Sequence, residues 1–446
     1  MSPWFFQLPL ELRAGLFFVL GLLVGTQINR GIYRLAWNAR WIGPWSPPHP
    51  KAPRRRWEDF LPVVGWFGLA REAPIHGGGY WIRPALLELA TGGIFAGVYA
   101  WEVTGRLTPP PPLLPLGLAP SNPIAGPTPE ALHAMALAHL LLFSLMLVAT
   151  FIDLDEKTVP DAITTPGTLL ALIWMAVAPS AGLPVFERIA DQWQVTFLKM
   201  TAPQVDLSVP DWPPWLSGPG ALAIGLLLYL GWVFAVSDKV RWKLLRRVGI
   251  GAFFVYMLES LCRGRGSWTR AAMCLIGVIV IFVVWVRADG DRLVHWQGLF
   301  SALCGMAFGG MLVWLVRLIG SAALGQEAMG YGDVTLMAMI GAFLGWQSTL
   351  IIFFLAPFCG VIIALTQWAL TGRKDIAYGP FLCLAAAVCV VQWAWLWERY
   401  GEPAFMLGPL VPAALFFCLI LMGGMLWFWR AVRTSPTPPH RPVEPP

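Results

Sequence analysis

The chain consists of long apolar segments separated by shorter polar stretches. Most segments reach or approach the roughly 20 residues that an α-helix needs to cross the hydrocarbon core of a bilayer. The segments are 12–29, 84–103, 132–152, 162–182, 219–236, 270–287, 296–319, 333–346, 349–371, 379–397 and 408–429. The pattern therefore predicts an all-α, polytopic integral membrane protein with about 11 transmembrane helices.

The positive charges between these segments indicate which loops face the cytoplasm. Loops 30–83 and 238–270 are rich in Lys and Arg, so we place them in the cytoplasm, and loops 104–130 and 184–218 are expected outside. Segment 248–262 is apolar, but it has only 15 residues and basic flanks, so we expect it to lie at the interface without crossing. This arrangement puts the N-terminus outside and the C-terminus in the cytoplasm.

The composition supports a membrane protein and excludes a soluble domain. Of the 446 residues, 57% are hydrophobic and 13% are charged, and the mean hydropathy is +0.63. A soluble domain would have about 25% charged residues. The net charge of +6 is concentrated in loops, so we expect membrane lipids and no nucleic acid among the partners. None of the seven cysteines forms a CxxC pair, which favours buried thiols and no metal site.

Two short acidic motifs lie at the borders of apolar segments. The first contains Asp153 and, directly after Val159-Pro160, Asp161; the second is Gly-Tyr-Gly-Asp at 330–333. A carboxylate at the edge of the hydrocarbon is costly, so it suggests a function. Two carboxylates held close together share one proton. Such a pair can hydrolyse a peptide, because the ionised partner activates a water while the protonated partner polarises the carbonyl.

Neighbouring residues fit a supporting role in such a site. Gly330 and Gly332 would let the backbone approach a substrate or another helix closely. Pro160 would start a helix, and Asp161 would favour its positive N-terminal end. Each motif alone also has an ordinary interpretation, since a lone Asp153 could be a helix cap and the glycines could serve helix packing. Both motifs on one predicted face favour a paired site.

These residues resemble the type IV prepilin leader peptidases, which are membrane aspartic proteases of the Gly-x-Gly-Asp type. The resemblance covers most of 10–182 and 298–390, including Tyr-Gly-Pro-Phe-Leu at 378–382. It implies that Asp153 and Asp333 are the catalytic pair. Presenilin-like intramembrane proteases share the Gly-x-Gly-Asp motif, so that motif alone would not distinguish the two families.

The resemblance also implies a function and a location. The protein would be an aspartic endopeptidase, multi-pass in the bacterial inner membrane. It would cut the short basic leader from prepilin or pseudopilin substrates at the cytoplasmic face, for a type IV pilus or type II secretion system. The peptidase step would need no cofactor.

The chain departs from the family in its first loop and near the second aspartate. Many members have two CxxC pairs in that loop, forming a zinc site, and methylate the new N-terminus with S-adenosylmethionine. Here the loop has no cysteine, and His76 alone is no metal site. Glu88 and Arg83 are the residues to test for a methyltransferase activity. Thr335 occupies the position where the family usually has Lys.

The predicted organisation has five parts. These are N-terminal helices with the basic loop (1–110), two halves of a peptidase core (131–183 and 298–397), an insertion with two extra spans (184–297), and an extra helix with a disordered Pro-rich tail (398–446). Two alternatives to a peptidase remain. One is an ion- or proton-coupled transporter, and the other is an inactive family relative that scaffolds pilin export.

Overall fold

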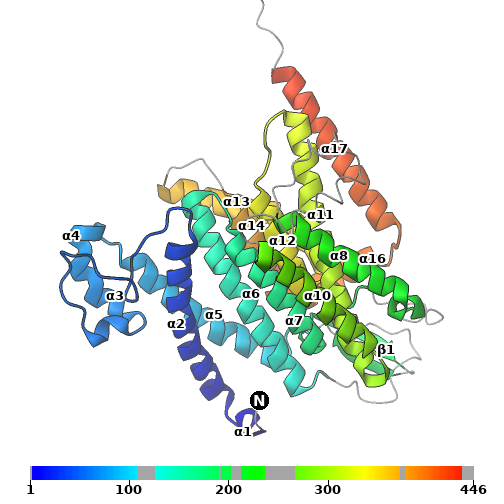
Figure 1. Ribbon diagram of the computed structural model, residues 1–446, viewed down its shortest axis with the longest axis horizontal. Helices are drawn as coiled ribbons and strands as arrows, with labels where there is room; N and C mark the ends of the chain where they lie inside the picture. Colours follow the sequence, from blue (N-terminus) through cyan, green and yellow to red (C-terminus); the bar gives the residue numbers. More distant parts are fainter. Residues whose placement is uncertain are drawn as a thin grey trace, which may run out of the picture.

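The described residues of the computed structural model form a bundle of α-helices with one small β-hairpin (Figure 1). The structure describes residues 3–108, 126–189, 192–201, 212–237, 267–371 and 377–433. In Figure 1 the N-terminus and the hairpin lie at one end of the molecule, and helix α17 (Leu410–Arg433) projects from the other.

The N-terminal helices pack through small residues. They are α1 (Pro3–Phe6), α2 (Leu10–Leu35), α5 (Ile82–Val103) and α6 (Pro129–Glu156). A Cβ at Gly21 of α2 would lie 2.8 Å from the Cα of Gly92 on α5, so the two backbones nearly touch. The connecting loop contains the short helices α3 (Val64–Leu69) and α4 (Ala73–His76) and projects to one side of the bundle (Figure 1).

The predicted insertion, 184–297, begins with a hairpin that the sequence did not predict. Helix α7 (Asp161–Val177) is followed by antiparallel strands β1 (Pro184–Ile189) and β2 (Gln192–Phe197), and then by α8 (Pro219–Ser237) and α10 (Ser267–Val286). The sequence predicted only that 184–218 is a loop expected outside, and it named no strands there. Phe186 pairs with Val195, and aromatic and β-branched residues of this kind favour extended backbone.

Indole groups attach the inserted region to the core helices. Trp393 donates to the Pro184 carbonyl at 2.8 Å, and Trp346 donates to the Met200 carbonyl at 2.7 Å. The Met200 carbonyl also accepts a hydrogen bond from Gln347 Nε2 at 3.3 Å.

The core is centred on helix α12 (Tyr331–Leu344), whose residues from Asp333 to Leu344 are all buried. Around it lie α7, α11 (Leu293–Leu324), α13 (Trp346–Thr371) and α14 (Gly379–Val391). Glycines allow α11 and α12 to approach each other: a Cβ at Gly309 would lie 2.5 Å from the Met337 carbonyl oxygen. Because α12 contacts protein on all sides, its length is not dictated by the bilayer.

The C-terminal part contains a sharp bend. After α14 come α15 (Trp393–Leu396), a π-helical turn (Trp397–Gly401), α16 (Glu402–Phe405) and α17. Segment 393–405 is bent by 89° from α14, so the predicted segment 379–397 is not one straight helix.

The prediction of a mainly helical, polytopic membrane protein is confirmed. Seven described helices are long and apolar enough to cross a membrane, or up to eight if the bent pair counts as one span. Predicted segments 162–182 and 333–346 correspond to α7 and α12, which are apolar but shorter. The number 11, the sides of the termini and the domain boundaries stay predictions, and segment 248–262 and the tail from 434 lie outside the described residues.

Candidate active site

The first motif forms a tight turn between α6 and α7. Asp153 lies in the last turn of α6 with 4% of its surface exposed. The helix ends at Lys157, which adopts a left-handed conformation (φ 57°) and donates its backbone N–H to the Asp153 carbonyl at 2.8 Å. Pro160 then caps α7, whose first residue is Asp161. The turn therefore brings Val159 back beside the end of α6.

The second motif forms the start of α12. Gly330 is the residue before the helix, and Asp333 lies in its first turn with 8% of its surface exposed. The Asp333 side chain accepts a hydrogen bond from the backbone N–H of Gly330. A carboxylate at this position also interacts favourably with the positive end of the helix dipole.

The two motifs meet in space. A Cβ at Gly332 would lie 2.8 Å from the Val159 carbonyl oxygen, so only glycine allows this approach of the two backbones. Asp153 and Asp333 lie close enough for the charge of one to act on the other. The structure thus brings together the two carboxylates that the sequence singled out.

A third segment, at the start of α14, completes this site. The backbone N–H of Gly379 donates to Oδ2 of Asp153 at 3.0 Å. A Cβ at Gly379 would lie 2.6 Å from the same oxygen. Tyr378 lies within electrostatic range of Asp333, and Cys383 within range of both carboxylates.

The start of α14 was not predicted to belong to the site. Apart from the family resemblance at 378–382, its local signal is Gly379-Pro380, a pair typical of a helix start because Pro fits the first turn of a helix.

Thr335 links the two motifs from the position where the family usually has Lys. Its hydroxyl bonds the Gly332 carbonyl at 3.0 Å and receives the Thr164 hydroxyl of α7 at 3.0 Å. The Asp161 side chain also lies within hydrogen-bonding reach of the Thr335 hydroxyl, whose single proton can go either to the Gly332 carbonyl or to the Asp161 carboxylate. Asp161 therefore lies against α12 just after the second motif, and its supporting role stays a prediction.

Glu88 and Arg83, the candidates for a second activity, have different partners. The Glu88 carboxylate is fully buried and accepts hydrogen bonds from Asn29 Nδ2 at 3.1 Å, Trp66 Nε1 at 2.8 Å and the Val63 backbone N–H at 2.6 Å. It therefore ties α2 and the first loop to α5.

Arg83 points toward α6. Its guanidinium pairs with Asp155 at 2.8 Å and lies over the Phe151 ring, 4.8 Å from the ring centre. The side chain thus connects the start of α5 to the helix that carries Asp153.

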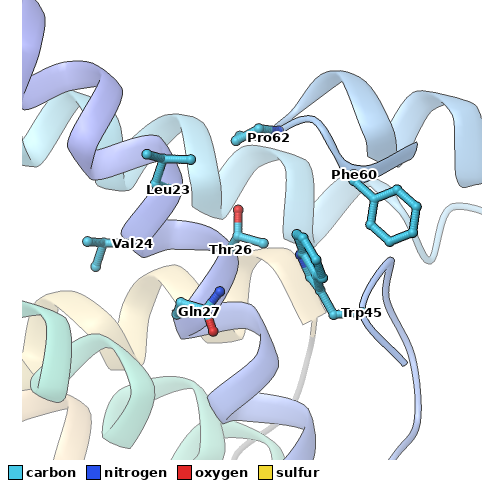
Figure 2. A pocket seen from close by; sticks show the side chains of 7 residues that line it. All are labelled: Leu23, Val24, Thr26, Gln27, Trp45, Phe60 and Pro62. Carbon is cyan, nitrogen blue, oxygen red and sulfur yellow. The ribbon is translucent and has the colours of Figure 1, made fainter. Parts of the chain in front are cut away.

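A cavity of about 270 Å³ lies beside the first loop (Figure 2). Its lining residues come from α2 and the loop and are Leu23, Val24, Thr26, Gln27, Trp45, Phe60 and Pro62. The lining holds no charged side chain for the sulfonium or the amino-acid group of S-adenosylmethionine, and its volume is below the usual range for ligand sites. Glu88 already has three donors, so these residues do not fit that cofactor.

The loop where many family members bind zinc contains an ion-pair cluster. The buried Asp59 accepts two hydrogen bonds from the Arg71 guanidinium, one of them at 2.9 Å. The buried Glu72 faces both Arg55, at 3.5 Å, and His76, at 3.6 Å. Among the described residues, no group of three or more His, Cys, Asp and Glu could hold a metal ion. The residues here do not fit zinc, because the carboxylates of Asp59 and Glu72 already pair with the guanidinium groups of Arg71 and Arg55.

Opposing effects act on the Asp59 carboxyl. Burial favours the neutral acid, but hydrogen bonds from the Arg71 side chain and the Arg56 backbone, with the charges of Arg71 and Arg55, outweigh it. The pKa of Asp59 therefore lies below its ordinary value.

Comparison with known proteins links the chain to one family. Residues 267–365 match the model of the type IV leader peptidase family. The matched range includes Asp333 and ends before α14, and it begins after Asp153. No solved structure matches the chain closely enough to count as similar.

Several curated relatives carry the name prepilin leader peptidase/N-methyltransferase. The one from Pseudomonas aeruginosa is 29% identical over 136 residues, which are 28% of this chain and 47% of that protein. The one from Aeromonas salmonicida is 32% identical over 146 residues, covering 28% of this chain and 50% of that protein. The one from Pectobacterium carotovorum is 35% identical over 117 residues, covering 26% and 42%. The chain thus spans about half the length of these relatives, and the resemblance to the family is confirmed.

Proposed function

We propose that this protein is a membrane aspartic endopeptidase that removes the short basic leader from prepilin-like or pseudopilin proteins at the cytoplasmic face of the bacterial inner membrane. The observation that carries the proposal is the meeting of the two carboxylate motifs at the start of α14. The family match and the relatives' names support the substrate class.

In this proposal Asp153 and Asp333 share one proton and hold a water between them. The ionised carboxylate takes a proton from the water, which attacks the scissile carbonyl, while the protonated carboxyl donates a hydrogen bond to the carbonyl oxygen. The proton then passes to the leaving amine, and the dyad returns to its first state. Gly379, Gly332 and Thr335 position the carboxylates, and no metal takes part in the step.

The mostly buried environment of the dyad fits this chemistry. Both carboxylates are less than one-tenth exposed, and a site of low dielectric strengthens the interaction of each with the reacting carbonyl. A leader held in extended form at the cytoplasmic ends of α6 and α12 would present its scissile bond to the pair. The relatives' second activity, N-methylation, is not part of the proposal, because the cavity and Glu88 do not fit S-adenosylmethionine.

Isosteric substitutions test the dyad. We expect Asp153→Asn and Asp333→Asn each to lower the rate of leader cleavage by at least about 10³-fold, since removing one member of a catalytic unit disables the unit. Asp155→Asn is the matched control, because Asp155 lies two residues from Asp153 but pairs with Arg83. It should cleave within about threefold of the unmodified protein.

The outcomes separate the proposal from its alternatives. Normal cleavage by both dyad variants would show that the assignment is wrong. Ion flux across liposomes that depends on Asp333, without a cleavage product, would indicate a transporter. Pilus assembly supported by the doubly substituted protein would indicate a scaffold without peptidase activity.

A further inference from the structure

The loop that leads into Asp333 is held by side chains of α11. Arg317 donates through Nε to the Met329 carbonyl at 2.8 Å and pairs with Glu327. The backbone N–H of Ala328 donates to the Ser321 hydroxyl at 3.0 Å. These contacts fix residues 327–329, which directly precede Gly330 and the candidate catalytic aspartate.

The first residue of this loop contacts α17 instead. Gly325 ends α11 in the left-handed conformation (φ 74°), and a Cβ there would lie 2.6 Å from Nη1 of Arg430. The Arg430 guanidinium therefore lies directly against the end of α11. A cation at this position interacts favourably with the negative end of the helix dipole and with the last carbonyl groups.

Helix α17 reaches this position by packing along α11 (Figure 1). A Cβ at Gly423 would lie 2.8 Å from Cγ2 of Ile319, and a Cβ at Gly320 would lie 3.9 Å from the Leu426 side chain. Positions 423, 426 and 430 share one helical face. Only 6% of the apolar span of α17 is buried, so this strip on α11 is its main attachment within the described residues.

We propose that α17 is a positioning element of the candidate active site, in which Arg430 holds the end of α11 and thereby the loop that carries Asp333. This gives a role to a helix for which the family resemblance provides none. Its catalytic consequence rests on the proposed function, whereas the contact between α17 and the loop does not.

Two adjacent glycines provide a matched test. Gly423→Leu places a side chain against Ile319 and pushes α17 away from α11, whereas a Cβ at Gly424 meets nothing within 4 Å. Both substitutions add the same apolar surface to the same helix. Hydrogen exchange of the Gly325 and Ala328 amides in the purified, intact protein should accelerate at least about tenfold in Gly423→Leu and stay unchanged in Gly424→Leu.

The same variants are then assayed for leader cleavage. In Gly423→Leu we expect kcat to fall roughly 10- to 100-fold with KM within about threefold, because displacing a reacting group by about 1 Å has an effect of this size. Arg430→Ala should also lower kcat while KM stays nearly unchanged. Arg430→Lys should recover most of kcat, because Lys keeps the cation at the helix end.

Each result has a definite meaning. Unchanged amide exchange in well-expressed Gly423→Leu overturns the proposal, and so does equal acceleration in both leucine variants. Failure of Arg430→Lys to recover activity overturns the role of the charge. If the exchange results hold but the unmodified protein cleaves no leader, the proposed peptidase function fails. The contact by which α17 holds the loop before Asp333 would still stand.

Discussion

The two glycines of the second motif should respond differently to substitution by alanine. At Gly332 an added Cβ would lie 2.8 Å from the Val159 carbonyl oxygen and 2.9 Å from the Val159 Cβ. At Gly330 the nearest atom would be Oδ2 of Asp333 at 3.7 Å, which is ordinary van der Waals contact. The sequence motif alone gives both glycines equal weight.

The structure allows the effect to be estimated. Carbon atoms in contact are normally about 3.5–4.0 Å apart, so Gly332→Ala must move the two motifs apart by roughly 0.7–1 Å. A misplacement of about 1 Å can lower a rate by about 10²-fold. Alanine in place of glycine also stabilises a helix by about 1 kcal/mol, so a loss of activity in Gly332→Ala would not reflect melting of α12.

The assay is cleavage of a prepilin-type leader by purified protein, with abundance and thermal unfolding measured in parallel. We expect Gly332→Ala to lose roughly 30- to 100-fold in kcat and Gly330→Ala to stay within about threefold. Similar activities of the two variants, whether both impaired or both intact, would refute the reasoning that Gly332 sets the separation of the motifs.

Three further predictions concern other parts of the structure. Gly379→Ala should also lower kcat roughly 30-fold or more, because its Cβ would lie 2.6 Å from the Asp153 carboxylate; a normal rate in the cleavage assay would contradict this contact. The lowered pKa of Asp59 means that its pair with Arg71 contributes stability above the unfolded-state value of about 3.9, which is lost as pH falls through the lower folded-state value. Hydrogen exchange of 56–71 should therefore be faster in Asp59→Asn than in the unmodified protein at pH 6, and the difference should shrink near pH 3; a constant difference would exclude this linkage. Glu88→Gln should reduce the free energy of unfolding by about 1–3 kcal/mol in denaturant titrations, because the amide nitrogen cannot accept one of the three hydrogen bonds that the carboxylate receives.

The sequence was most informative where a residue conflicts with its surroundings. Asp153 and Asp333 lie at the borders of apolar segments, where a carboxylate is energetically costly, so the sequence alone identified them as candidates. Gly379, which donates to Asp153, does not conflict with its surroundings in this way. A Gly-Pro helix start has the same sequence pattern whether or not it lies at a functional site. The role of Gly379 depends on a contact across 226 positions, which no local pattern encodes.

The other differences between prediction and structure also have physical causes. Segment 333–346 was predicted as a short span, and α12 is short because other helices surround it. The sequence did not predict strands β1 and β2, because two strands of only six residues each give a weak pattern within a stretch rich in Pro and Trp. Glu88 was selected as a residue to test for a second activity; its hydrogen bonds join α2, α5 and the first loop, and the chemical role stays a prediction.

The candidate site combines three segments of the chain that are synthesised at different times. Asp153, Asp333 and Gly379 leave the ribosome in that sequence, and the hydrogen bond between the first and the last joins residues 226 positions apart. At roughly 5–20 residues per second, about 10–45 s pass between their appearances. During this interval the carboxylate of Asp153 has no backbone donor from α14. Under the proposed function, the site would therefore stay incomplete until the start of α14 has been synthesised.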